Sequence, residues 1–222
     1  MLFPSYKNEL EYLKKGYDLI VGCDEVGAGP VAGPVVSAAC VIDPSCIGDY
    51  RSKNKWYYRV RDSKTVNENE REALVKEIIS HCVTYGVGEV WPDEIDRINI
   101  HQAKLLSTKK AIQQLFEKLS GREAAKAMVF IDGIFTIKSL DLPLFNVEQK
   151  AVIGGDAKIL SISAASIIAK VHRDRILKEY DLKMPEYGFA KHKGYNTKEH
   201  QKAIMTHGIS DFHRKSFLKN LI

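Results

Sequence analysis

The chain has 222 residues, of which 45% are hydrophobic and 27% are charged, and its formal net charge is +5. This length suits one domain with a sizeable core, and the composition is ordinary for a soluble globular protein. No signal peptide or membrane-spanning run is recognisable, and the four cysteines lack zinc-site spacing, so we expect a cytoplasmic monomer with no membrane partner.

Hydrophobic periodicity predicts strands first and then alternating helices and strands. After an N-terminal surface helix, strands are expected near 18–26 and 35–43, a helix over 67–81, a strand over 83–90, a helix over 93–120, strands over 127–133 and 144–150, and a helix over 161–180. A loop over 183–196 and a basic helical region complete the chain. This order indicates an α/β protein with a mixed sheet.

The C-terminal segment is more basic than the rest of the chain. Residues 170–222 contain twelve Lys and Arg against six Asp and Glu, whereas the preceding 169 residues contain 21 bases and 22 acids. Such asymmetry is typical of proteins with an anionic partner such as nucleic acid. Charge alone favours the simpler interpretation, a solvated surface of exposed helices.

Four acids lie at ends of apolar strands or in glycine turns. The segments "GCDEVG", "FIDG" and "IGGDAK" contain Asp24 with Glu25, Asp132 and Asp156. A lone acid of this kind commonly caps a turn, but four are harder to explain by turns. Because successive strand residues point to opposite faces, Asp24 and Glu25 share a site only if the strand ends or bends there, which Gly27 favours.

Neighbouring buried carboxylates raise each other's pKa, and a divalent cation removes that cost. Carboxylate oxygens suit Mg²⁺ or Mn²⁺, and all-carboxylate sites are typical of phosphoryl transfer. The four acids therefore predict a two-metal phosphodiesterase.

The glycine loop after the first strand has a second interpretation. Residues 27–33 read G-x-G-x-x-x-G, one residue longer than the dinucleotide fingerprint, and Pro30 removes a phosphate-facing N–H. A nucleotide-binding module is therefore disfavoured. The glycines instead allow backbone groups to approach a sugar or phosphate closely.

Five motifs in order extend the argument to a family. "DEVGAGPVAGPVVSAACVI", "RDSK", "FIDG", "GGDAKILSISAASIIAKVHRDR" and "HKGYNTKEH…HG…FHRKSF" lie between residues 18 and 217. Over this range the chain resembles bacterial ribonuclease HII, a family of type 2 ribonucleases H. The resemblance implies a ribonuclease H-like mixed sheet flanked by helices over residues 1–180, with a basic C-terminal helical extension over 181–222 that contacts substrate.

The resemblance also implies an activity and its cofactor. The expected enzyme is an endoribonuclease that uses two Mg²⁺ or Mn²⁺ ions to cleave the RNA strand of RNA–DNA hybrids, leaving 3′-hydroxyl and 5′-phosphate ends. Incision at ribonucleotides embedded in duplex DNA is expected as well. The basic C-terminal segment would then lie along the duplex backbone.

Individual roles follow from the same resemblance. The metal ligands map onto Asp24, Glu25, Asp132 and Asp156. Asp24, Asp132 and Glu25 would hold one ion, and Asp24 and Asp156 the other. Tyr195 would stack on the deoxyribose that follows the ribonucleotide, and Lys64 would contact a phosphate.

One position departs from the family pattern. The family's glycine loop reads Gly-Arg-Gly, whereas this chain has Gly27, Ala28 and Gly29. The loop inspects the 2′-hydroxyl largely through its backbone, so the two glycines are expected to preserve ribose recognition. The missing guanidinium affects the expected strength of substrate binding and incision at single ribonucleotides. A hybrid-binding protein with little catalysis is the alternative hypothesis.

Other side chains within these motifs are expected to play lesser parts. Lys170 and Arg173 are expected to pair with acids rather than touch substrate. His192, His200, His207 and His213 are expected to be solvated or to face phosphates.

Overall fold

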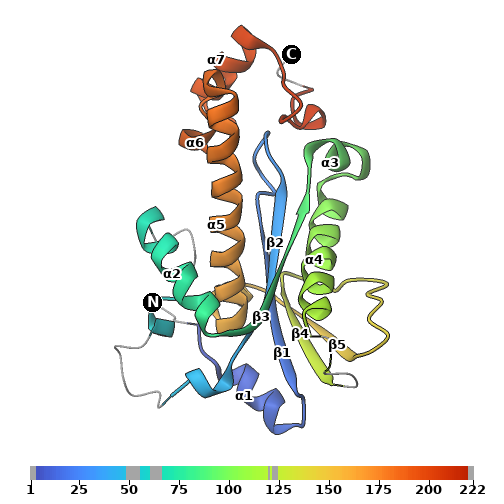
Figure 1. Cartoon of the computed structure of the whole chain (residues 1–222). Coiled ribbons are helices and arrows are strands. Elements are labelled where there is room, and N and C mark those ends of the chain that lie inside the picture. Colours follow the sequence, from blue (N-terminus) through green and yellow to red (C-terminus); the bar gives the residue numbers. More distant parts are fainter. Residues whose placement is uncertain (1–3, 49–55, 61–66, 120, 122–124, 220–222) are drawn as a thin grey trace.

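A mixed sheet with the strand order β3-β2-β1-β4-β5 organises the protein (Figure 1). The computed structural model describes residues 4–48, 56–60, 67–119, 121 and 125–219. The strands are β1 (Leu19–Val26), β2 (Val35–Ile42), β3 (Cys82–Val90), β4 (Lys126–Asp132) and β5 (Asn146–Val152). β2 is antiparallel to β1 and β3, whereas β4 is parallel to β1 and β5. The predicted mixed sheet is confirmed.

Helices cover both faces of the sheet (Figure 1). They are α1 (Lys7–Lys14), α2 (Glu68–Ser80), α3 (Pro92–Ile98), α4 (Ile100–Glu117), α5 (Leu160–Lys183), α6 (Phe189–His192) and α7 (Lys198–His207). Short 3₁₀ turns lie at Pro44–Cys46, Trp56–Tyr58, Gly155–Ala157, Pro185–Tyr187 and Lys215–Phe217.

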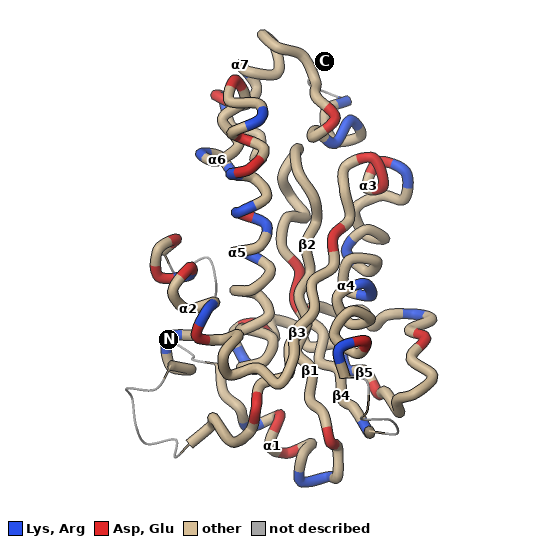
Figure 2. The backbone as a smooth tube through the Cα atoms, in the orientation of Figure 1, with Lys and Arg blue, Asp and Glu red and all other residues tan. Residues whose placement is uncertain are grey.

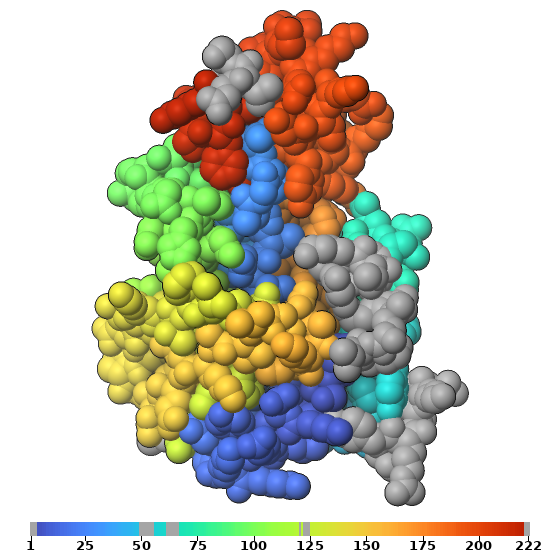
Figure 3. All heavy atoms as spheres, turned by 180° about the vertical axis from the view of Figure 1, so that it is seen from behind, coloured from blue at the N-terminus to red at the C-terminus, as the bar shows by residue number. Residues whose placement is uncertain are grey.

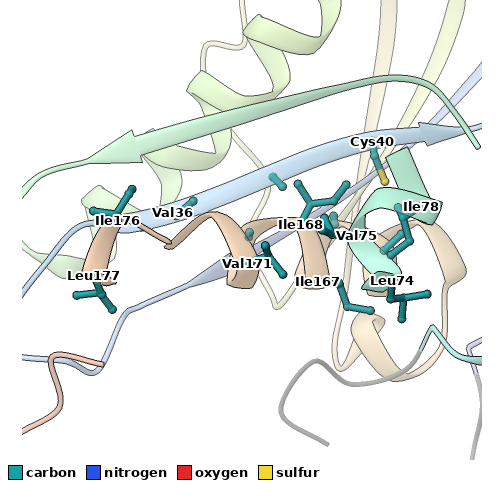
Figure 4. Close-up of a cluster of buried hydrophobic side chains, with 14 of the residues drawn as sticks. Val36, Cys40, Leu74, Val75, Ile78, Ile167, Ile168, Val171, Ile176 and Leu177 are labelled. Carbon is teal, nitrogen blue, oxygen red and sulfur yellow. The ribbon is translucent and has the colours of Figure 1, made fainter. Parts of the chain in front are cut away.

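Two apolar layers hold the helices to the sheet. On one face, Val36 and Cys40 of β2 pack with Leu74 and Ile78 of α2 and Ile168 of α5 (Figure 4). On the other face, Leu19, Val21 and Cys23 of β1 and Val129 of β4 pack against Ile112 and Leu115 of α4. Alternate β1 residues therefore face opposite helices, as the two-residue period of a strand requires.

Glycines bring both helices close to the sheet. A Cβ atom on Gly22 of β1 would lie 2.2 Å from the carbonyl carbon of Ser161 in α5. A Cβ atom on Gly88 of β3 would lie 2.1 Å from the carbonyl oxygen of Ser107 in α4. Only glycine permits these approaches, which bring α5 close to the strand that carries Asp24.

The single helix predicted over 93–120 is wrong. The segment forms α3 and α4, which meet at Asn99 with φ +70°. The Asn99 side chain accepts a hydrogen bond from the backbone N–H of Gln102, so it caps α4. Asn99 combines φ +70° with ψ 163°, far from helical values, so the helix breaks there although the periodic pattern of the sequence continues.

The C-terminal region departs from its predicted outline in part. The segment over 183–196, predicted as a loop, contains a 3₁₀ turn and the short α6. The division at residue 180 stays a prediction, and α5 continues across it to Lys183. Within the described part of the chain, no helix is long and apolar enough to cross a membrane.

Candidate active site

Asp24 and Glu25 lie in β1 and point to opposite faces of the sheet. β1 continues to Val26 and turns only at Gly27, with φ +91°, so the strand end or bend expected between the two acids does not occur. Asp24 is 6% exposed and receives a hydrogen bond from Ser166 of α5, whereas Glu25 pairs with Lys104 of α4. The two carboxylates therefore lie on different faces of the sheet, Asp24 on the face of α5 and Glu25 on the face of α4.

Asp132 ends the neighbouring parallel strand β4. The register pairs Cys23 with Ile131, so Asp24 and Asp132 follow at adjacent positions at the same edge of the sheet. Asp132 Oδ1 accepts a hydrogen bond of 2.6 Å from the N–H of Gly155. Gly155 begins the 3₁₀ turn that carries Asp156, so this bond ties the fourth predicted acid to the same edge.

The electrostatics of this edge favour a cation. Burial raises the pKa of Asp24 well above its usual range, and the charges of Glu25 and Asp132 raise it further. The bonds from Ser166 and from the N–H of Glu25, the latter 2.7 Å long, offset only part of this rise. Asp24 thus has an incompletely compensated negative charge.

A divalent cation fits these residues by donor type and charge. The carboxylates of Asp24, Glu25, Asp132 and Asp156 supply the hard oxygen ligands that Mg²⁺ and Mn²⁺ prefer. In the described part of the chain, no three His, Cys, Asp or Glu side chains are already arranged to hold one ion. Because Glu25 pairs with Lys104, binding of a cation by all four acids would require the Glu25 carboxylate to leave that lysine.

The glycine loop between β1 and β2 is held from behind by Arg214. This side chain is 0% exposed, and its guanidinium donates hydrogen bonds of 2.7–3.1 Å to the carbonyl oxygens of Gly27, Ala28 and Gly33. Burial lowers the pKa of Arg214 to about 9. Arg214 therefore holds the loop through its backbone carbonyls, and Gly29 is the exposed residue of this part of the loop.

Arg173 of α5 holds the next part of the loop. It is also buried, and it donates hydrogen bonds to the carbonyl oxygens of Ala32 and Pro34 and to that of Lys193. Among the described residues no ion pair joins Arg173 to an acid, so the pairing expected for it is not found there. The same expectation is confirmed for Lys170, which forms a 2.6 Å ion pair with Asp174.

Tyr195 lies beside the glycine loop. Its ring is 50% exposed, and a Cβ atom on Gly29 would lie 3.7 Å from a ring carbon. The carbonyl oxygen of Gly194 accepts hydrogen bonds from Val31 and Ala32, so the two segments are joined through their backbones. The structure thus brings Gly27, Ala28, Gly29 and Tyr195 together, whereas Lys64 lies outside the described residues.

Three of the four C-terminal histidines form a buried cluster, so the expectation that they are solvated is wrong for them. His192, His200 and His213 are at most 8% exposed, and the Nε2 atoms of His200 and His213 lie 3.0 Å apart. Nδ1 of His200 lies 2.9 Å from the carbonyl oxygen of Tyr195. The cluster therefore supports the segment that carries Tyr195, while His207 is exposed as expected.

Sequence patterns alone missed Lys104, Ser166 and Arg214 as parts of this region. Figure 2 shows acidic positions within the sheet and basic positions along α4, α5 and the C-terminal segment. Lys104 and Ser166 each lie on a helix beside the acid they contact, but no spacing in the sequence indicates that contact. Arg214 reaches a loop 181–187 residues away.

Comparison with known proteins agrees with this architecture. The crystal structure of ribonuclease H2 from Pyrococcus horikoshii matches with a TM-score of 0.68 and 27% identity, covering 89% of this chain and 92% of that one. Ribonuclease HII of Acetivibrio thermocellus is 45% identical over 96% of this chain and 75% of its own length. That of Caldicellulosiruptor saccharolyticus is 42% identical over 98% and 95%.

The sheet, its flanking helices and these likenesses define a hydrolase with the ribonuclease H fold. The family model for ribonuclease HII matches residues 21–220. The chain belongs to the ribonuclease HII family, the type 2 ribonucleases H, which cleave the RNA strand of RNA–DNA hybrids.

Proposed function

We propose that the chain cleaves RNA paired to DNA at the edge of the sheet where β1 and β4 end, and that it also incises duplex DNA at an embedded ribonucleotide. The observation that carries this proposal is the buried Asp24 carboxylate, whose pKa is raised by burial and by the charges of Glu25 and Asp132. A bound divalent cation would favour the ionised form of this carboxylate, which burial and the neighbouring charges otherwise disfavour.

The four acids have the role of metal ligands in this proposal. Asp24, Glu25 and Asp132 would hold one Mg²⁺ or Mn²⁺, and Asp24 and Asp156 a second. When bound, such ions activate water and stabilise the leaving oxygen of an in-line displacement, which yields 3′-hydroxyl and 5′-phosphate ends. Ser166 orients Asp24, and the N–H of Gly155 orients Asp132.

The glycine loop and Tyr195 have the role of reading the substrate. Arg214 holds the carbonyl oxygens of Gly27, Ala28 and Gly33, and Gly27 itself is buried against Arg173, so Gly29 is the exposed glycine that would face a ligand. Gly29 leaves space beside the half-exposed Tyr195 ring for a ribose and the sugar that follows it. Because contact is made through the backbone, Ala28 can replace the family's arginine without closing this space.

The test compares three duplexes of one sequence with Mg²⁺ and with Mn²⁺: an RNA–DNA hybrid, DNA with one embedded ribonucleotide, and plain DNA. We expect cleavage of the first two, with the second cut on the 5′ side of the ribonucleotide, and no cleavage of plain DNA. Cleavage of the hybrid alone would show that the loop backbone and Tyr195 do not suffice for single ribonucleotides. Binding without cleavage of any duplex would contradict the proposal and favour a hybrid-binding protein.

A further inference from the structure

A groove that the four acids do not explain runs along α4 beside the segment that follows β4. Its first part, about 240 Å³, is lined at one end by Glu25 and Asp132. Its second part, about 480 Å³, is lined by Lys109 and Lys138. His101, Leu105 and Phe135 line both parts, so the groove is continuous and opens at the proposed site of cleavage.

The charge of the groove away from the acids is positive. The second part contains Lys109 and Lys138 and no Asp or Glu. Neither lysine has an ion-pair partner among the residues that the structure describes, in contrast to Lys110 on the same helix, which pairs with Glu94. Two free ammonium groups in a groove without acids are suited to phosphates.

The floor and rim of the groove are apolar and partly open to solvent. Phe135 is 49% exposed and Ile134 is 65% exposed, although both lie within three residues of Asp132. The Phe135 ring meets the His101 ring edge-on, with centroids 4.7 Å apart. An aromatic ring held in this way offers a flat surface to a sugar, and the flanking lysines suit the phosphates on either side.

The groove and the segment that carries Tyr195 are built from different parts of the chain. Figure 3 shows the residues after β4 (yellow) below those of α3 and α4 (green), with the C-terminal segment (red) beyond the green ones. The groove is lined by α4 and by the segment after β4, and none of its lining residues belongs to the C-terminal segment, where Tyr195 lies beside Gly29. Under the proposed function Tyr195 contacts the nucleotides on the 3′ side of the cleaved bond, so we assign the groove, which meets the acids at Glu25 and Asp132, to the other arm of the strand.

We propose that this groove binds the sugar–phosphate backbone of the cleaved strand on the 5′ side of the cleaved bond. Lys109 and Lys138 contact phosphates, and Phe135 packs against a sugar. The inference rests on the proposed function, because it needs a nucleic-acid strand positioned at Asp132.

The test measures binding of hybrid duplexes by fluorescence anisotropy without metal, so that no cleavage occurs. In one series the arm on the 5′ side of a fixed cleavage position is shortened, and in the other the 3′ arm. The variants are Lys109→Gln with Lys138→Gln, and Phe135→Ala. The matched controls are Lys7→Gln with Lys14→Gln, which removes the same charge from α1, and Leu144→Ala, an exposed apolar residue that lines a separate cavity.

We expect the groove lysine pair to lower the slope of log K against log[salt] by about 1.4 to 1.8, since each phosphate contact contributes about 0.7 to 0.9. Phe135→Ala should weaken binding roughly three- to ten-fold. Both losses should disappear when the 5′ arm is removed, and the controls should bind like the wild type. Changes no larger than those of the controls, or losses that follow the 3′ arm, would overturn the inference.

The same variants separate this inference from the proposed function. If the wild type cleaves the hybrid and the groove variants bind like the controls, the groove inference is refuted and the proposed function stands. A wild type that cleaves no hybrid would remove the proposed function, whatever the groove binds.

Discussion

Replacement of Arg214 by Gln tests whether the glycine loop is held from inside the protein. The Arg214 guanidinium is fully buried and donates to three carbonyl oxygens, those of Gly27, Ala28 and Gly33. A glutamine amide is shorter and carries one NH₂ group, so it cannot reach all three. At least two buried carbonyls then lose their donor, and each such loss costs about 1–3 kcal/mol.

The variant no longer buries a charged guanidinium, and this gain in free energy offsets part of the penalty. Its pKa of about 9 shows that burial disfavours the charged form. We therefore expect a net loss of about 3 kcal/mol in the free energy of unfolding. For a chain of 222 residues, this corresponds to a fall in Tm of roughly 6–12 °C. The loop should also shift, so the KM for the hybrid should rise.

The assay is thermal and urea unfolding of Arg214→Gln beside two further variants. Lys215→Gln is the control, because the neighbouring Lys215 is exposed and its ion pair with Asp211 is long, at 3.9 Å. Arg214→Lys keeps the charge but not the planar array of donors, so it should recover only part of the stability. A Tm of Arg214→Gln within the range of Lys215→Gln, or full recovery by lysine, would refute this reasoning.

Further predictions concern ionisable groups with shifted pKa values. Burial raises the pKa of Glu9 to about 7, so its stabilising contribution is complete below pH 4.5 and is lost as the pH rises to 7. Urea unfolding should show that the wild type loses about 3 kcal/mol of unfolding free energy relative to Glu9→Gln between pH 4.5 and 7. Parallel plots of unfolding free energy against pH for the two proteins would contradict this. Burial lowers the pKa of His200 and of His213 to about 4, so their contribution is present above pH 6.5 and is lost as the pH falls to 4. Unfolding free energy should therefore drop by on the order of 3 kcal/mol for each histidine in that range, and a His213→Gln variant with the same pH profile as the wild type would contradict it. Lys104 competes with a cation for Glu25, so Lys104→Met should bind Mn²⁺ more tightly in calorimetry, and unchanged or weaker binding would exclude that competition.

The sequence predicted the sheet because its signals are local. The apolar run of β1, the glycine turn at Gly27 and the apolar run of β2 each occupy one short continuous segment, so each can be recognised from neighbouring residues alone. The break at Asn99 has no such signal, because helical periodicity continues on both sides of a residue that adopts φ +70°. Local patterns thus predict elements more reliably than they predict a break within a pattern.

The sequence singles out the acids of the proposed site but not the residues that contact them. Asp24, Asp132 and Asp156 stand out because acids at the ends of apolar strands or in glycine turns are conspicuous. Lys104 and Arg214 stand out only after folding, since each contacts a residue 79 or more positions away. The histidines were assigned to solvent because polar residues in a basic segment are usually exposed. Three of them are instead buried, with edge-on contacts to Tyr187 and Phe189 and a stacked pair of His192 and His200.

The most direct test of the central claim is the Asp132→Asn variant with an RNA–DNA hybrid. The asparagine oxygen can still accept the hydrogen bond from Gly155, so the fold and hybrid binding should be retained. Loss of the carboxylate removes a proposed metal ligand, and we expect cleavage to be abolished with both Mg²⁺ and Mn²⁺ while hybrid affinity, measured without metal, stays largely unchanged. Turnover equal to that of the wild type would contradict the assignment of this edge of the sheet as the catalytic site.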